Sequence, residues 1–239
     1  MVLVQNALAT LLTFAIALSW LQLMNRLAYR ALLAQTLSRK IIHIGTGPLF
    51  VLCWPFFSAS GEARYWAALV PLAITLKFLA IGLGWLKDEA AVKSMTRQGN
   101  PREILRGPLY YGLVFVACTL LFWRSSPAGI LALMMMCGGD GLADVVGRRW
   151  GRHKLPLSAE KSWIGSGAML LGSWGLGWSM VALFAALGYF QLSQTPLQLG
   201  SLIGAIALVA TGVEALPFRD IDNLTLTLTV AGLAQWLLT

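Results

Sequence analysis

Charged residues are scarce in this sequence of 239 residues. Asp, Glu, Lys and Arg make up only 12% of the chain, whereas 57% is hydrophobic and the mean hydropathy is +0.70. A soluble globular domain typically has about 25% charged and about 45–50% apolar residues. The scarcity of charge therefore excludes an ordinary soluble domain. It predicts an all-α, polytopic integral membrane protein in which residues 1–239 form a single membrane domain.

Several well-known site patterns are also missing. The three cysteines, Cys53, Cys118 and Cys137, form no C-x-x-C pair, so neither a zinc site nor a disulfide framework is indicated. The chain contains no G-x-x-x-x-G-K-[ST] and no H-R-D sequence, which excludes the nucleotide sites of P-loop proteins and protein kinases. The N-terminus has no basic region before its apolar run, so we interpret that run as a spanning helix and not as a cleavable signal peptide.

Long apolar runs make up most of the chain. Because a helix needs about 20 apolar residues to cross the hydrocarbon core, we expect seven or eight transmembrane helices. The fourth and the last run are short, which leaves the number open. The first run is expected to be peripheral to a core that carries the catalytic motifs within residues 39–230. The candidate spans are 2–24, 41–59, 64–86, 108–123, 127–146, 163–190, 198–217 and 222–238.

The cationic residues concentrate in alternate connections between these runs. The net charge is +8, and the first, third, fifth and seventh connections hold 15 of the 18 Lys and Arg residues. Cytoplasmic loops carry such an excess, so these connections are predicted to face the cytoplasm and both termini the opposite side. The charge is thus a topology signal, and a nucleic-acid partner is excluded. The residues are Arg26, Arg30, Arg39, Lys40, Lys87, Lys93, Arg97, Arg102, Arg106, Arg148, Arg149, Arg152, Lys154, Lys161 and Arg219.

Asp140 and Asp144 are the first candidates for a catalytic role. They are four residues apart, so on a helix they share a face. They follow an apolar run, and acidic residues at such places are costly and tend to be functional. One or two carboxylates together with substrate phosphates are the usual ligands of Mg²⁺, so we predict a magnesium site at Asp140 and Asp144. The alternative is that both are solvated at the membrane interface.

The sequence EKSWIGSG, residues 160–167, indicates a phosphate site at the start of the sixth helix. A helix N-terminus offers free N–H groups and the positive end of its dipole to a phosphate, and a lysine beside it adds a point charge. The alternative is that the cations of this loop only anchor it to anionic lipid headgroups. The candidate nucleotide- and phosphate-binding residues are Arg152, Lys154, Lys161, Ser162, Gly165 and Ser166.

Further polar residues fall on the same predicted face. Glu214 and Asp222 are candidates for a general base that accepts the proton of a substrate hydroxyl, whereas Asp220 fits a solvated turn. His43 is either part of the site or a hydrogen-bonded interfacial residue. The residues predicted to complete the polar site are Lys40, His43, Glu103, Arg106 and Asn223.

Four stretches occur in the order found in a known enzyme family. They are SRKIIHIGTG (38–47), REILRGPLYYG (102–112), GDGLADVVGRRWGRHKLP with KSWIGS (139–166), and VEALP with DIDNLT (213–225). In these stretches the chain resembles the phytol kinase and polyprenol (dolichol-like) kinase family over roughly residues 39–230. Trp163 and Ile164 stand where dolichol kinase-like members carry a Glu-containing segment, so the likeness is greatest to the phytol/farnesol kinase branch.

The resemblance implies a multi-span membrane kinase. Such an enzyme transfers the terminal phosphate of a nucleoside triphosphate, typically CTP, to the hydroxyl of an isoprenoid alcohol from the bilayer, with Mg²⁺. It implies phytol as substrate and phytyl phosphate for prenyl-lipid synthesis or salvage, of the tocopherol or quinone type, as product. Carried over by position, Asp140 and Asp144 serve metal–nucleotide binding, Lys161 and Ser162 serve phosphate binding, and Asp222 with Asn223 completes the polar site. The alcohol would be oriented or deprotonated by Glu214, Asp222 or Asp144.

Other functional classes remain as alternatives. A CDP-lipid cytidylyltransferase would use the same metal and phosphate chemistry, but it would release pyrophosphate. A CDP-alcohol phosphotransferase is disfavoured because its paired D-x-x-D-G-x-x-A-R and D-x-x-x-D motif is absent. A transporter is less consistent with the sequence, because transporter sites lie between repeated halves and no internal repeat is visible. The sequence leaves open which prenyl alcohol is used and whether the chain forms a homodimer.

Overall fold

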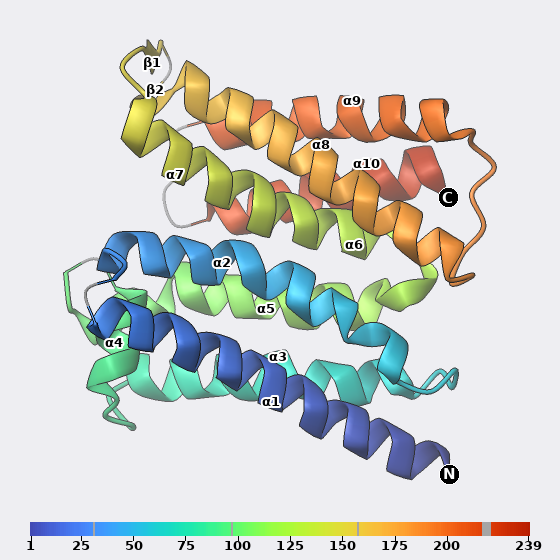
Figure 1. The fold of residues 1–239 in the computed structure, drawn as a ribbon, viewed down its shortest axis with the longest axis horizontal. Helices are drawn as coiled ribbons and strands as arrows, with labels where there is room; N and C mark the ends of the chain where they lie inside the picture. The colour runs from blue at the N-terminus through green and yellow to red at the C-terminus, as the bar shows by residue number, and fades with distance from the viewer. Residues whose placement is uncertain (31, 97, 157, 217–220) are drawn as a thin grey trace.

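The protein is a bundle of long helices that run roughly along one direction (Figure 1). The computed structural model describes residues 1–30, 32–96, 98–156, 158–216 and 221–239, apart from the side chains of residues 25, 29 and 35. A two-stranded antiparallel sheet interrupts the bundle between α7 and α8. The elements are α1 (Val2–Tyr29), α2 (Gln35–Leu52), η1 (Trp54–Phe56), α3 (Ala63–Gly82), α4 (Glu89–Met95), η2 (Pro101–Leu105), α5 (Gly107–Leu121), η3 (Trp123–Ser125), α6 (Pro127–Met134), η4 (Met135–Asp140), α7 (Gly141–Trp150), β1 (Lys154–Leu155), β2 (Ser158–Ser162), α8 (Trp163–Ala186), α9 (Pro196–Ala215) and α10 (Asp222–Leu238).

Within the described residues, six helical segments are long and apolar enough to cross a membrane. An α-helix suits this environment because it satisfies all its backbone polar groups internally. The chain is therefore an all-α polytopic membrane protein, as its composition predicts, but the number of such segments is lower than the expected seven or eight. The segments are Val2–Ala28, Ala63–Gly82, Pro101–Leu121, Pro127–Trp150, Trp163–Ala186 and Pro196–Ala215.

The other two predicted spans correspond to α2 and α10. Both lie beside the longer helices in the bundle (Figure 1). α2 carries Arg39, Lys40 and His43 in its first half, and α10 has only 17 residues. These features explain the difference: α2 combines an apolar half with a polar half, and α10 is short.

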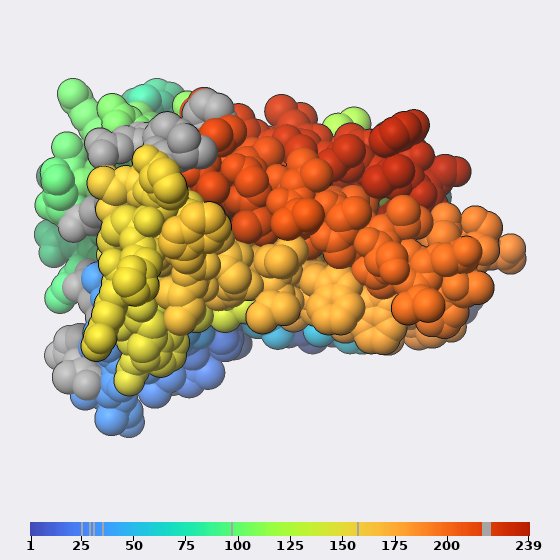
Figure 2. Space-filling model, turned by 90° about the horizontal axis from the view of Figure 1, so that it is seen from above, coloured from blue at the N-terminus to red at the C-terminus, as the bar shows by residue number. Residues whose placement is uncertain are grey.

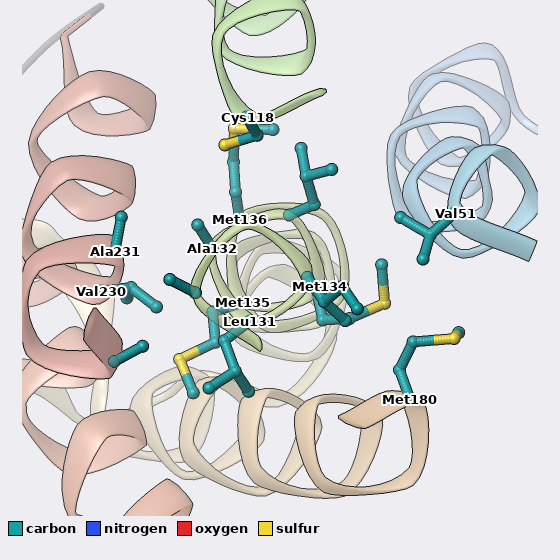
Figure 3. Close-up of a cluster of buried hydrophobic side chains, with 14 of the residues drawn as sticks. Val51, Cys118, Leu131, Ala132, Met134, Met135, Met136, Met180, Val230 and Ala231 are labelled. Atoms are coloured by element: carbon teal, nitrogen blue, oxygen red, sulfur yellow. The ribbon is translucent and has the colours of Figure 1, made fainter. Parts of the chain in front are cut away.

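The centre of the hydrophobic core is α6. All of its residues are buried, and Figure 3 shows it surrounded by neighbouring helices. It packs against α2, α5, α8 and α10. The side chains of Met134 and Met135 leave the helix on different sides (Figure 3). A helix that is apolar all round is suited to a fully buried position, and unbranched methionines fill irregular gaps between such helices.

The connections between helices lie at the two ends of the bundle. One end holds the α1–α2 connection, α4, η2, the β1–β2 hairpin, the end of α9 and the start of α10 (Figure 1). Both chain termini lie at the opposite end, and Figure 2 shows the hairpin and the α8–α9 connection at opposite ends. We call the first the polar end, formed by residues 35–43, 89–96, 98–107, 140–156, 158–163, 214–216 and 221–223. It contains the described cationic connections, as the charge pattern predicted; Arg97, Arg219 and Asp220 lie outside the described residues.

Glycines allow η4 and α7 to pack closely against α8. A Cβ atom on Gly139 would collide with Ser173 Oγ, and one on Gly138 would collide with Leu176 Cδ1. Gly141 faces α2 in the same way, because its Cβ would collide with Ile44. The glycines around Asp140 therefore permit the approach of helices, which brings α2, α7 and α8 together around the aspartate.

We expect Gly139→Ala to destabilise the fold. The added methyl group meets the buried Ser173 hydroxyl and Met169 Sδ, and overpacking of this kind typically costs about 1–3 kcal/mol. Thermal unfolding in detergent should show a lower midpoint than the unmodified protein. Gly175→Ala in α8 is the matched control, because nothing lies within 4 Å of its added Cβ. Equal midpoints for the two variants would contradict this packing role.

Candidate active site

Asp140 is brought inside the bundle by an irregular helical turn. α6 continues into the π-helical segment η4, which ends at Asp140 and leads directly into the ten residues of α7. Such π-helical turns occur frequently at functional sites. Because α7 continues to Trp150, Asp140 lies within the Pro127–Trp150 segment and farther from its end than the predicted span 127–146 suggested.

Lys40 of α2 lies between the two aspartates. Its Nζ is 3.8 Å from Asp140 Oδ2 and 3.4 Å from Asp144 Oδ2. Asp144 also pairs with Arg148 one turn along α7, with Nε 2.8 Å from Oδ1. The two carboxylates therefore gather around one cation, as their spacing of four residues predicted. The side chains of Asp140 and Asp144 are only 16% and 23% exposed, so both carboxylates pair with Lys40 largely shielded from water.

His43 contacts the same carboxylate oxygen of Asp140 as Lys40 does. Its Nε2 is 3.3 Å from Asp140 Oδ2 and 3.0 Å from the carbonyl oxygen of Met136. Because a carbonyl oxygen only accepts hydrogen bonds, the second contact requires a proton on Nε2. The His43 ring lies against Tyr111, with centroids 4.6 Å apart, and the Tyr111 hydroxyl donates to the His43 carbonyl oxygen at 2.9 Å. His43 is thus part of the polar cluster, and Tyr111 holds it there.

A second ion pair connects the hairpin to α9. Lys161 Nζ lies 2.7 Å from Glu214 Oε1 and also donates to the Glu214 carbonyl oxygen. Glu214 is nearly buried in the last turn of α9. Both residues interact electrostatically with Asp140. Lys161 of the EKSWIGSG stretch and Glu214 at the end of α9 therefore meet at the polar end, although they are far apart in the sequence.

Asp222 and Asn223 are the first residues of α10 and lie at the polar end. The backbone N–H of Asn223 donates to Asp222 Oδ1 at 3.0 Å, and the Asn223 side chain is nearly buried. Asp222 interacts electrostatically with Asp140, Lys161 and Lys40. Asp140, Asp222 and Lys40 line the same cavity, although they come from separate motifs.

A cavity of about 650 Å³ extends from this polar cluster into the bundle. Its polar part is lined by Arg39, Lys40, His43, Gln98, Asn100, Arg102, Glu103, Arg106, Asp140, Asp222 and Asn223. Its apolar part is lined by α1, α2, α3 and α5, through residues that include Ile16, Trp20, Leu49, Phe50, Val70, Ile74, Phe78 and Phe115. Of the three acids predicted as base, Glu214, Asp222 and Asp144, only Asp222 belongs to the described lining.

Asp140 and Asp144 offer carboxylate oxygens to Mg²⁺. Within the described residues, no group of three His, Cys, Asp or Glu side chains could hold a metal ion by itself. Asp144 Oδ2 is buried and accepts no hydrogen bond from the described residues, although Lys40 lies nearby. An oxygen of this kind, beside a second carboxylate, fits an ion that takes one or two protein ligands and completes its shell with water and phosphate.

The other residues predicted to bind phosphate lie in different surroundings. Ser162 caps α8, since the Gly165 N–H donates to its Oγ at 3.3 Å. Gly165 packs closely on α7, because a Cβ there would meet the Ala143 carbonyl oxygen at 3.0 Å. Lys154 donates to the Glu160 carbonyl oxygen within the hairpin, and Arg152 is exposed. Ser166 Oγ is buried without a partner among the described residues.

Sequence reasoning did not find the apolar wall of the cavity. The first helix was expected to be peripheral to the core, and Thr13, Ile16 and Trp20 of α1 line the cavity together with residues of α3 and α5. A lipid-facing leucine and a cavity-lining leucine look the same in an apolar run. One signal was available: Gly45 lies directly against the Trp20 ring and leaves space for it between α1 and α2.

Comparisons with known proteins identify the family. The chain is 48% identical over 236 residues to a protein named probable phytol kinase 1, chloroplastic, from Oryza sativa subsp. japonica, covering 98% of this chain and 74% of the relative. The chain belongs to the phytol kinase family. A probable phytol kinase from Triticum aestivum is 47% identical over 92% of this chain and 73% of its own length. Phytol kinase 1 from Arabidopsis thaliana is 41% identical over 90% of this chain and 69% of its own length.

Two further comparisons gave no match. No protein-family model matches the chain, and no solved structure is similar to it. The phytol kinase family is therefore assigned from the named relatives. The similarity to these three relatives extends over 90–98% of the chain.

Proposed function

We propose that this protein is a membrane kinase that transfers the terminal phosphate of CTP to the hydroxyl of phytol. The observation that carries the proposal is the cavity, whose polar part contains Asp140 and Asp222 and whose walls beyond them are apolar. An amphiphilic alcohol matches this division, with its hydroxyl among the polar residues and its chain among the apolar ones. The names of the relatives support phytol as the substrate.

Asp140 and Asp144 would hold Mg²⁺ together with the phosphates of the nucleotide. The ion would supply neutralisation of the phosphate charge. Lys40, which lies 3.8 and 3.4 Å from the two carboxylates, and Lys161, which pairs with Glu214, would stabilise the charge on the transferred group. Glu214 positions Lys161 through their ion pair, in which Lys161 Nζ lies 2.7 Å from Glu214 Oε1.

Asp222 is our candidate for the general base. Its carboxylate would accept the hydroxyl proton of the alcohol as the alcohol oxygen bonds to the terminal phosphorus. The bond between that phosphorus and the bridging oxygen breaks, and the electron pair leaves with CDP. The products are phytyl phosphate and CDP, and the reaction needs no other reactant. The choice of Asp222 follows from its position in the cavity lining beside Asp140.

The polar end would face the cytoplasm, where the nucleotide is available. The concentration of Lys and Arg in the connections of that end supports this orientation. The phytyl phosphate produced there would serve prenyl-lipid synthesis or salvage of the tocopherol or quinone type.

The proposal is tested with membranes that contain the protein and with CTP or ATP labelled in the terminal phosphate. Phytol, geranylgeraniol, farnesol and undecaprenol are offered in turn, and labelled lipid is extracted. We expect labelled phytyl phosphate, formed faster with CTP than with ATP. Absence of a phosphorylated product from every alcohol would refute the function.

Removal of divalent cations should abolish the reaction. Without the metal, the phosphate charge beside Asp140 and Asp144 is no longer neutralised by the ion, so the rate with EDTA should fall to the background of membranes lacking the protein. Addition of excess Mg²⁺ should restore it. A rate that persists after exhaustive chelation would show that the two aspartates do not act through a metal.

A further inference from the structure

The apolar part of the cavity has a definite direction and a closed inner end. Along α2 the lining begins with Arg39 and Lys40 at the polar end and finishes with Phe50 and Cys53 near the opposite end. The lining of α3 and α5 follows the same direction, from Phe78 to Val70 and from Pro108 to Phe115. The cavity is therefore a tunnel that runs along the bundle axis.

Buried side chains form the floor of this tunnel. Phe50 and Phe115 contact each other, with ring centroids 5.6 Å apart, and Cys53 and Val70 complete the inner end. Each of these four side chains is at most 6% exposed. Behind them, Trp54 is fully buried and lies edge-on to Phe50 at 5.9 Å. The floor is thus supported by the core and does not open to the far side.

The length of the tunnel can be compared with that of its proposed occupant. Lys40 and Cys53 are thirteen residues apart, which corresponds to about 20 Å at about 1.5 Å per helical residue. The main chain of phytol has sixteen carbon atoms and would extend about 19 Å at about 1.2 Å per bond, as extended-chain dimensions give. The main chain of farnesol has twelve carbon atoms and would reach only about 14 Å on the same scale.

We infer that the floor formed by Phe50, Cys53, Val70 and Phe115 sets the length of the isoprenoid alcohol that the enzyme accepts. This inference rests on the proposed function and names the part of the tunnel that selects the substrate. A twenty-carbon prenyl alcohol fills the tunnel from the polar cluster to the floor. A longer one meets Phe50 and Phe115 before its hydroxyl reaches Asp222, and a shorter one leaves apolar surface unfilled.

Two variants with opposite effects test the inference. Phe115→Ala deepens the tunnel, and Val70→Phe shortens it. Phe184→Ala is the matched control, because Phe184 is a fully buried phenylalanine that does not belong to the tunnel lining. The kcat/KM values are measured for farnesol, phytol, geranylgeraniol and the twenty-five-carbon geranylfarnesol.

We expect Phe115→Ala to raise the ratio of kcat/KM for geranylfarnesol over phytol by about tenfold or more, since even one methylene can change specificity by that factor. Val70→Phe should raise the ratio of farnesol over phytol by a similar factor. Phe184→Ala should leave both ratios unchanged, whatever its effect on the amount of folded protein.

The outcomes separate this inference from the proposed function. If the unmodified protein phosphorylates no alcohol, the proposed function fails. If it phosphorylates phytol but neither floor variant changes the ratios, the inference about the floor is wrong while the function stands. A longer chain could then leave through the shallow cavity of about 360 Å³ between α1 and α2, which shares Ile16, Trp20 and Leu49 with the tunnel.

Discussion

Asp140→Asn is expected to reduce phytol phosphorylation by about 1,000-fold, mainly in kcat. The substitution keeps the size of the side chain but removes the charge that faces Lys40 and His43 at 3.8 and 3.3 Å. In the proposed reaction this charge holds the metal and orients the phosphates. Loss of one electrostatic group at a reacting centre typically costs about 100- to 1,000-fold, and loss of a metal ligand belongs at the upper end.

The control for this variant is Asp88→Asn. Asp88 caps α4 and pairs with Lys77 at 2.7 Å, outside the tunnel lining. Removing its charge should change the rate by less than about twofold, because exposed ion pairs contribute little. Both proteins should be compared at equal folded concentration in detergent. Asp140→Asn with the kinetics of the control would disprove the assignment of Asp140 to the site.

Asp222→Asn is expected to lower kcat by about 100- to 10,000-fold, the range that general-base catalysis usually contributes. An amide cannot accept the hydroxyl proton, although it can still accept a hydrogen bond from the alcohol. The KM for phytol should therefore change much less than kcat. Steady-state kinetics with varied phytol at saturating CTP separate the two constants.

Glu214→Gln provides the comparison for Asp222. Glu214 is another acid of the polar end, but it contacts Lys161 and does not belong to the described tunnel lining. Because it acts through Lys161, its loss should weaken binding of the nucleotide and raise the KM for CTP. If Glu214→Gln reduced kcat as much as Asp222→Asn with no change in the KM for CTP, Glu214 would be the better candidate for the base.

Hydropathy and charge predicted the helical membrane fold and the end of the bundle at which the polar motifs meet. These predictions were correct because a long apolar segment satisfies its backbone hydrogen bonds in a membrane by forming a helix. Loops rich in Lys and Arg, in turn, lie on one side of the membrane. The count of spans was less accurate. The first half of α2 is polar and carries Lys40 and His43. Mean hydropathy therefore predicts neither the length of α2 nor its role in the site.

The candidate site was predictable only in part. The spacing of Asp140 and Asp144 predicted a shared face, and the structure confirms that both approach one cation, which is Lys40. The π-helical turn that presents Asp140 has no simple sequence signal. The tunnel was not predictable, because residues such as Phe115 and Val70 acquire their role from helices that pack on them from elsewhere in the chain.

The most direct test of the central claim is product analysis with purified protein, phytol and CTP labelled in the terminal phosphate. We predict that the label moves to phytyl phosphate, that one CDP forms for each phytyl phosphate, and that Asp140→Asn forms both about 1,000-fold more slowly. Release of labelled pyrophosphate with a cytidine-linked lipid, or hydrolysis of CTP without any labelled lipid, would contradict a phosphoryl transfer to phytol at this site.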